Sequence, residues 1–123
     1  MKIIDLINAK NAFDLNCKYD GDMQLALKVV KFIKAIETET DFYNEKYSEI
    51  ISRHAEKDKN GNIIRCENGL KIKKDCIDSC TKDINELNNL EVEKPNVLFT
   101  PDELEKCDLT GNDIYAIYPF INL

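Results

Sequence analysis

The sequence has little of the material from which catalytic and ligand-binding sites are usually built. Its 123 residues include four glycines and one histidine, His54. Without a glycine-rich run there is no loop of the kind that cradles a nucleotide phosphate. No Cys-x-x-Cys pair is present, so the usual ligand spacing of a structural zinc site is missing too. We therefore predict a protein that is not an enzyme and that carries no metal and no cofactor.

Long apolar runs are also missing. No stretch approaches the roughly 20 apolar residues that a membrane-spanning helix needs. The first 15 residues place Asp5 inside the apolar stretch and lack the basic start, apolar core and cleavage site of a signal peptide. We expect a cytoplasmic protein that does not contact a membrane.

The five cysteines are odd in number and widely scattered, and without a secretion signal this predicts reduced thiols. Cys76 and Cys80 are four residues apart, so on a helix they share a face. Together with Cys66, Cys107 or His54 they would form a zinc site, and a Cys–His nucleophilic pair is a further alternative. We favour buried structural thiols, because the neighbouring isoleucines have the spacing of a core.

The net charge of -6 is unevenly distributed along the chain. Residues 57–82 hold seven Lys or Arg against four Asp or Glu, whereas residues 83–123 hold two against nine. An acidic last third speaks against direct nucleic-acid binding, which requires a basic face. It is compatible with ordinary solubility and with a surface that binds a basic partner.

Apolar residues recur every three or four positions from about residue 22 to residue 55, which predicts one long helix. Asp22 stands at its start as the expected N-cap. At 1.5 Å per residue the helix would be roughly 50 Å long, more than a small domain covers with its own elements. We therefore expect an antiparallel partner helix or a second subunit along it. The apolar stripe weakens between Thr38 and Thr40, where we expect a bend.

The remaining elements are shorter. Residues 3–16 and 73–88 have helical spacing, and Asn68-Gly69 lies between two short apolar runs, which is a strong hairpin signal. Brief strands are expected at residues 90–93 and 97–99. The prediction is a single α+β domain over residues 1–123, mostly helical, with one long helix, a small β-hairpin, a second helix and short C-terminal helical turns.

Two capped turns are expected near the C-terminus. Thr100, Pro101 and Glu103 have the pattern of a capping box, and Thr110 begins a second turn that Pro119 ends. The apolar residues of the last ten positions and of the second turn are expected in the core: Ile114, Tyr115, Ile117, Phe120 and Ile121.

Residues 56–67 resemble a twelve-residue calcium loop, with Asp58, Asn60, Gly61 and Glu67 at ligand or turn positions. Three features oppose that interpretation. The first ligand would be a glutamate, the ninth position is Ile64, and the exiting helix is interrupted at once by Asn68-Gly69. We interpret residues 58–61 as the turn that ends the long helix, with Gly61 at positive φ.

The order of elements resembles a family of small phage and prophage proteins of unknown function, encoded near tail and lysis genes in low-GC Gram-positive bacteria. The resemblance rests on a long helix followed by EKDKNG at residues 56–61, LEVE at residues 90–93 and YPFI at residues 118–121. His54 and Ala55 depart from the Tyr-Gly that the family tends to have there. The resemblance implies a place in the host-cell cytoplasm and carries no catalytic residues.

Two functions compete. The first is a phage accessory or assembly factor that binds a structural protein, or itself as a homodimer, through the long helix. The second is an inhibitor of a host defence protein, similar to an anti-CRISPR, that uses an acidic C-terminal surface against a nucleic-acid-binding groove. The expected partner-binding residues are Glu91, Glu93, Asp102, Glu103, Glu105, Asp108, Asp113, Lys71, Lys73 and Lys74. The three lysines have two interpretations: protection of an edge strand, or contact with phosphate or an acidic partner.

Overall fold

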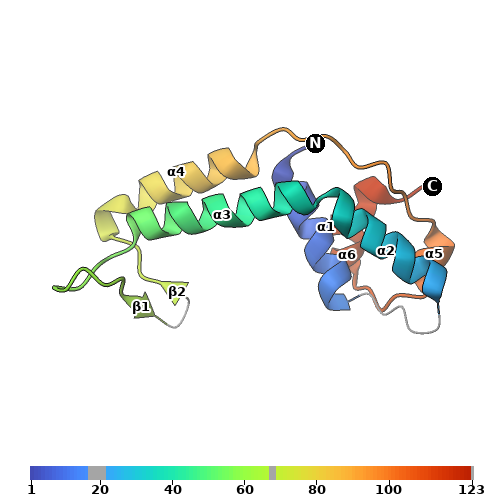
Figure 1. Cartoon of the computed structure of the whole chain (residues 1–123), viewed down its shortest axis with the longest axis horizontal. Coiled ribbons are helices and arrows are strands. Elements are labelled where there is room, and N and C mark those ends of the chain that lie inside the picture. The colour runs from blue at the N-terminus through green and yellow to red at the C-terminus, as the bar shows by residue number, and fades with distance from the viewer. Residues whose placement is uncertain (17–21, 67–68, 123) are drawn as a thin grey trace. The chain divides into compact units, whose positions relative to one another are not determined.

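A computed structural model describes residues 1–16, 22–66 and 69–122 of the chain (Figure 1). Contacts between residues divide the chain into two compact units. Unit 1 consists of Met1–Thr40 and Glu91–Leu123, and unit 2 of Asp41–Leu90. The prediction of a single domain stays a prediction.

Unit 1 is built from four α-helices whose ends the sequence marks clearly. They are α1 (Ile3–Asn16), α2 (Met23–Ala35), α5 (Pro101–Glu105) and α6 (Gly111–Ile117). Asp22 caps α2, because its carboxylate accepts the backbone N–H of Leu25 at 3.0 Å. Thr100 and Thr110 both form capping boxes, at the starts of α5 and α6. These caps and the helix over residues 3–16 confirm the predictions made from the sequence.

Four phenylalanines form the centre of the unit 1 core. The rings of Phe13, Phe32, Phe99 and Phe120 are all fully buried, and neighbouring centroids lie 4.7–5.8 Å apart. Phe99 reaches this cluster from an extended segment whose backbone N–H donates to the Phe120 carbonyl at 2.7 Å. The brief strands expected at residues 90–93 and 97–99 are reduced to isolated bridges, Lys2 with Glu91 and Phe99 with Ile121.

The C-terminal residues contribute only part of the expected core. Ile117 and Phe120 are fully buried and Ile121 packs against the core. The prediction is wrong for Ile114 and Tyr115, which are 37% and 85% exposed. Helix α6 ends at Ile117, and a 3-10 turn, η2 (Tyr118–Phe120), carries Pro119 in its first turn.

The single long helix predicted over residues 22–55 is wrong. The segment forms two helices, α2 and α3 (Glu37–His54), separated at Ile36. The N–H of Ile36 donates to the Ile33 carbonyl, a tightened last turn of α2, and the side chain of Ile36 is buried in the unit 1 core. Neither proline nor glycine marks this interruption, which lies two residues before the expected bend.

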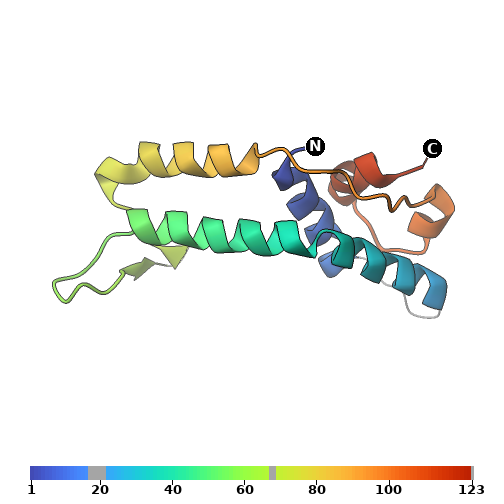
Figure 2. The same ribbon diagram turned by 45° about the horizontal axis from the view of Figure 1, so that its top comes forward.

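Unit 2 is dominated by a helical hairpin. From Asp41 onward, α3 lies beside α4 (Ile77–Asn88), which a short 3-10 turn, η1 (Lys74–Cys76), precedes (Figures 1 and 2). The Tyr43 hydroxyl donates a 2.7 Å hydrogen bond to the Asn88 side chain and ties the two helices together. The helix predicted over residues 73–88 is confirmed for Ile77–Asn88, with the 3-10 turn before it.

The predicted α+β class is wrong, because the fold is all-α. In the described part of the chain, the only strands are the two-residue β1 (Arg65–Cys66) and β2 (Gly69–Leu70). Their pairing is antiparallel, but two residue pairs do not make a sheet layer that a core could pack on. The tip predicted at Asn68-Gly69 lies partly outside the described residues. None of the described helices is both long and apolar enough to cross a membrane.

Candidate functional site

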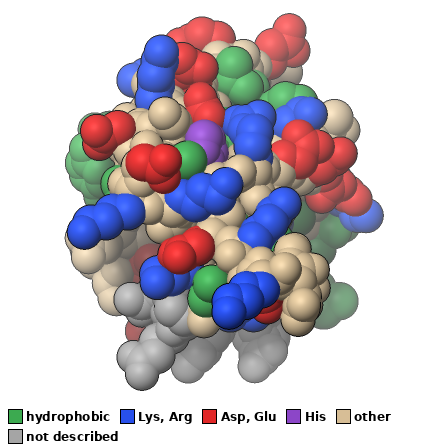
Figure 3. Space-filling view, turned by 90° about the vertical axis from the view of Figure 1, so that its left-hand side faces the viewer, with side chains coloured by type: hydrophobic (Ala, Val, Ile, Leu, Met, Phe, Trp, Pro, Cys, Tyr) green, Lys and Arg blue, Asp and Glu red, His purple; other side chains and the backbone are tan. Residues whose placement is uncertain are grey.

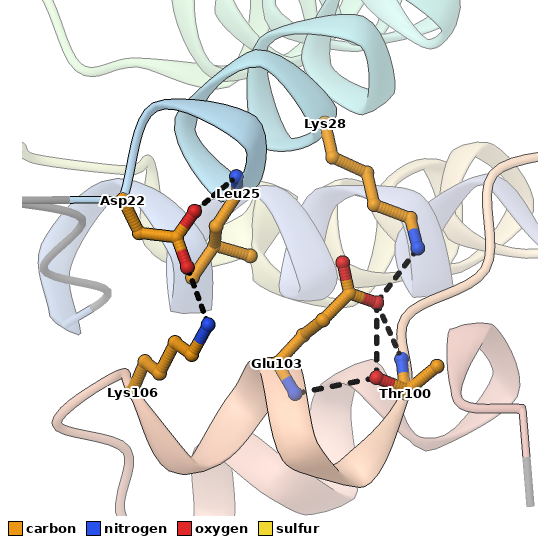
Figure 4. Close-up of polar contacts among 6 residues, drawn as sticks. All are labelled: Asp22, Leu25, Lys28, Thr100, Glu103 and Lys106. Atoms are coloured by element: carbon orange, nitrogen blue, oxygen red, sulfur yellow. Dashed lines mark hydrogen bonds and ion pairs between the residues drawn. The ribbon is translucent and has the colours of Figure 1, made fainter.

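Glu103 was predicted as part of a partner-binding surface, but the fold uses its carboxylate internally. One oxygen, Oε1, accepts hydrogen bonds from Lys28 Nζ at 2.7 Å, from the Thr100 N–H at 2.9 Å and from the Thr100 hydroxyl at 3.1 Å (Figure 4). Burial raises the pKa of Glu103, but the hydrogen bonds from Lys28 and Thr100 lower it by more than burial raises it. The pKa of Glu103 therefore lies below its ordinary value. Glu103 therefore joins α5 to α2.

A second ion pair joins the same two helices. Lys106 Nζ lies 2.6 Å from Asp22 Oδ2, while the other oxygen of Asp22 caps α2 (Figure 4). The hydrogen bond from Lys106 lowers the pKa of Asp22, and the same bond raises the pKa of Lys106. The lysine at the end of α5 is thus directed to α2 and neutralises an aspartate there.

The other predicted acidic residues differ in how far they take part in contacts within the fold. Asp113 is half-buried, and its carboxylate accepts the Thr110 N–H at 2.9 Å in the α6 capping box. Glu91 is exposed but lies 3.0 Å from the amino group of Met1. The remaining members of the set are exposed on the surface of unit 1: Glu93, Asp102, Glu105 and Asp108. The structure thus takes Glu103 and Asp113 out of the predicted acidic surface.

The predicted basic residues lie together in unit 2, after β2. Lys71 forms an ion pair with Glu56 at 3.2 Å, and Lys73 and Lys74 are exposed. All three line an open hollow of about 710 Å³ that also contains carboxylates. The end of unit 2 shown in Figure 3 carries Lys and Arg side chains interspersed with Asp and Glu. Mixed charge of this kind does not form the uniform basic face that phosphate binding favours.

The α3–α4 hairpin carries a groove of about 260 Å³ on one face. This groove, the hairpin groove below, has an apolar floor and two rows of opposite charge. The residues that define it are Phe42, Lys46, Ile50 and Arg53 from α3, and Asp83, Glu86, Leu87 and Leu90 from or just after α4. Phe42 and Leu90 are both 42% exposed, so large apolar surface remains open to solvent. The cations all come from α3 and the anions all from α4.

The only histidine belongs to an ion cluster at the end of α3. Asp83 Oδ2 lies 2.9 Å from His54 Nε2 and 2.8 Å from the Arg53 guanidinium. The hydrogen bond to His54, followed by the one from Arg53, lowers the pKa of Asp83 despite partial burial. The cluster ties the end of α3 to α4.

Of the described cysteines, Cys76 and Cys80 are free. Cys80 is a free, buried thiol, and burial raises its pKa, which disfavours the nucleophilic thiolate. Cys76 is free as well, but the prediction that all thiols are reduced is wrong, because Cys107 is disulfide-bonded. Among the side chains that the structure describes, no three His, Cys, Asp or Glu groups come together as metal ligands.

Residues 58–61 form a tight turn. Oδ1 of Asp58 accepts the N–H groups of Asn60 and Asn62 at 2.9 and 3.0 Å, so this oxygen is engaged by backbone donors. Gly61 has φ +80°, as predicted. Helix α3 ends earlier than expected, at His54, and the turn instead joins two extended segments bridged at Lys57 and Ile63. Glu67, the expected last calcium ligand, lies outside the described residues.

Comparison with protein-family models, curated proteins and solved structures finds no match. The hairpin groove was missed by sequence reasoning, although the 42–53 stretch lies within the predicted contact helix. Its second wall comes from residues some 40 positions later in the chain, and only the fold places the two walls together.

Proposed function

We propose that the protein is a phage- or prophage-type accessory or assembly factor that works by binding protein rather than by catalysis, and that α3 carries its contact surface. The observation that supports this is the hairpin groove: an open apolar strip between one cationic and one anionic helix face. The partner that we propose is a second copy of the chain.

Unit 2 has too little material to bury its own apolar surface. Among the side chains of unit 2 that the structure describes, the buried hydrophobic ones are Tyr43, Ile50, Ala55, Cys80 and Leu87, and two of these are small. Phe42, Tyr47, Ile77 and Leu90 remain 40–50% exposed. A pair of helices forms one layer, and stable domains pack at least two layers around a core. A second helical hairpin on the groove would complete a four-helix arrangement.

The charges of the groove match a second copy. If a two-fold axis runs parallel to the helices between the two hairpins, α3 of one copy packs antiparallel on α4 of the other. Lys46 of each copy then faces Glu86 of its partner, while Arg53 and Asp83 stay paired within each copy. An isologous interface requires a self-complementary patch, and a patch with one basic and one acidic half meets that requirement.

The dimer should be weak. The α3 segment from Asp41 to His54 is about 21 Å long at 1.5 Å per residue. A face two helices wide and of that length buries roughly 1,000–1,400 Å² in total on dimerisation, at the lower end of the range for specific interfaces. We expect an affinity in the micromolar range for so small an interface, with protein concentration controlling the assembly state.

Sedimentation equilibrium over about 10 µM to 1 mM tests this proposal. The wild-type protein should pass from monomer to dimer across that range. Phe42→Glu should remain monomeric, because it places a charge on the apolar floor. The matched control is Val30→Glu, an exposed apolar residue of α2 outside the groove, which should dimerise like the wild type. A wild-type protein that stays monomeric at 1 mM would refute the self-association.

The exposed acidic residues of α5 support a second function. Asp102 and Glu105 are exposed on α5, and the nearby Lys106 is paired with Asp22. We propose as the alternative that this acidic surface inhibits a host defence protein by occupying its nucleic-acid-binding groove. The tagged protein would then recover a defence nuclease from phage-infected cells, and the nuclease would be lost as salt increases. Recovery of tail or capsid proteins instead would favour the assembly factor.

A further inference from the structure

Unit 1 contains a second apolar hollow, between α5 and α6, with no part in the hairpin groove. Its volume is about 410 Å³, within the range of about 300–1,000 Å³ that is usual for ligand pockets. We call it the α5–α6 pocket. The residues that define it are Leu104, Glu105, Leu109, Ile114, Tyr118 and Ile121.

Residues of the unit 1 core form the floor of the pocket, and one side of the pocket is open to solvent. Leu104 is buried, and Leu109 and Ile121 pack against the core cluster. Ile114 and Tyr118 are 37% and 58% exposed, so two large apolar side chains at the opening are only partly covered. Apolar surface left open beside a hydrophobic base is typical of a site that receives an apolar side chain from a partner.

Among the described residues that line the pocket, charge is of one sign. Glu105 is the charged residue that lines it, and Asp102 is exposed on the same short helix. The basic residue of this region, Lys106, is held by Asp22 on α2 at 2.6 Å, and the carboxylate of Glu103 is held by Lys28 (Figure 4). The two ion pairs to α2 therefore leave the acidic charge at the pocket without a neighbouring cation from α5.

The one cysteine that lines the pocket is not available as a nucleophile. Cys107 lines it, but that sulfur is disulfide-bonded and offers no thiol. The chemistry that remains is burial of an apolar group together with attraction of a nearby positive charge.

From this combination we infer that the α5–α6 pocket binds a protein segment that inserts one large apolar side chain, flanked by Lys or Arg. The apolar side chain fills the hollow beside Ile114 and Tyr118, and a flanking cation approaches Glu105. This site does not rest on the hairpin groove: it lies in unit 1, and dimerisation through α3 and α4 can fail without affecting it.

The experiment is a titration of the full-length, isotope-labelled chain with the peptide acetyl-Lys-Lys-Phe-Lys-Lys-amide, followed by amide chemical shifts. Binding should shift the amides of Leu109, Ile114 and Tyr118. A peptide with Ala in place of Phe should bind at least about tenfold more weakly, since burial of the ring supplies most of the affinity. A peptide with Glu in place of Lys should not bind.

Variants separate a specific site from general attraction to an acidic protein. Glu105→Gln should weaken binding about threefold to tenfold at low salt. The matched control Glu93→Gln removes an exposed acid that does not line the pocket, and it should leave binding unchanged. Tyr118→Ala should also weaken binding, with folding verified from the unchanged amide spectrum of the remaining core.

Three results would overturn the inference. The first is equal binding of the Phe and Ala peptides, which would mean charge attraction alone. The second is a set of shifted amides away from α5 and α6, and the third is no shift at millimolar peptide. A shift confined to the hairpin groove would count against this pocket while leaving the proposed self-association to be judged by sedimentation.

Discussion

Glu103→Ala should destabilise the protein markedly, although Glu103 belongs to a surface helix of only five residues. Its Oε1 atom accepts three hydrogen bonds, one from Lys28 and two from Thr100. The alanine variant removes the reciprocal half of a capping box and leaves Lys28 without its partner. Both losses affect the junction of α5 with α2, which covers the aromatic core of unit 1.

The magnitude can be worked out from these contacts. Loss of a helix cap costs about 1 kcal/mol. The side chains of Lys28 and Glu103 are 31% and 26% exposed, which places the ion pair between a surface and a buried pair, and its loss costs about 1 kcal/mol. A total of about 2 kcal/mol lowers the Tm by roughly 8 °C for a chain of this size.

Thermal unfolding followed by circular dichroism at pH 7 measures this change. The matched control is Glu105→Ala, which removes an exposed carboxylate from the same helix and should change the Tm by less than about 2 °C. A Tm for Glu103→Ala as close to the wild type as that of the control would refute the assignment of Glu103 to the fold.

The pH dependence gives a second test of the same residue. Because the pKa of Glu103 in the folded protein lies below its ordinary value of 4.5, the ionised carboxylate stabilises the folded state. That contribution is fully present above the unfolded-state pKa and is lost as the pH falls through the folded-state pKa. The Tm difference between the wild type and Glu103→Gln should therefore shrink as the pH is lowered from 7 to about 3. A difference that stays constant would contradict this account.

Two further predictions concern the backbone and the core. Gly61→Ala should cost about 1 kcal/mol by chemical denaturation, because φ is +80° there, whereas Gly111→Ala at the start of α6 should not destabilise. Equal effects would refute the role of the positive φ. Phe120→Ala should cost about 3–5 kcal/mol because its ring is fully buried, whereas Tyr115→Ala, at 85% exposed, should cost less than about 0.5 kcal/mol. A mild Phe120→Ala variant would show that the core is not formed around the aromatic cluster.

Local signals in the sequence predicted the helix ends well. Asp22, Thr100 and Thr110 each accept the backbone N–H of the residue three positions later, and this chemistry depends only on neighbours in the chain. The same signals identified Glu103 as the third residue of a capping box. A glutamate at that position usually serves the helix itself. The sequence therefore already argued against Glu103 as a partner-binding residue.

Features that depend on distant residues could not be read in the same way. The apolar spacing continues through Ile36, so periodicity predicts one helix where the structure has two. The break occurs where Ile36 is buried by the unit 1 core, including segments near the C-terminus. The Asn-Gly signal likewise indicates a turn, but it does not fix the number of residue pairs, and two pairs leave the fold all-α.

The site was predictable only in part. The contact helix was expected between residues 22 and 55, and the charge asymmetry of the chain was visible from its composition. The pairing of a cationic α3 face with an anionic α4 face required the hairpin itself. So did the loss of Glu103 and Asp113 from the acidic surface, because hydrogen bonds determine which carboxylates remain available to a partner.

The most direct test of the proposed self-association is a charge exchange across the hairpin groove, measured by sedimentation equilibrium at one high protein concentration. Lys46→Glu and Glu86→Lys should each weaken the dimer, since each places like charges opposite one another in the two-fold arrangement. The double variant restores opposite signs and should recover the wild-type dimer. If the double variant dimerises no better than the single variants, or if neither single variant changes the assembly state, the groove is not the contact surface.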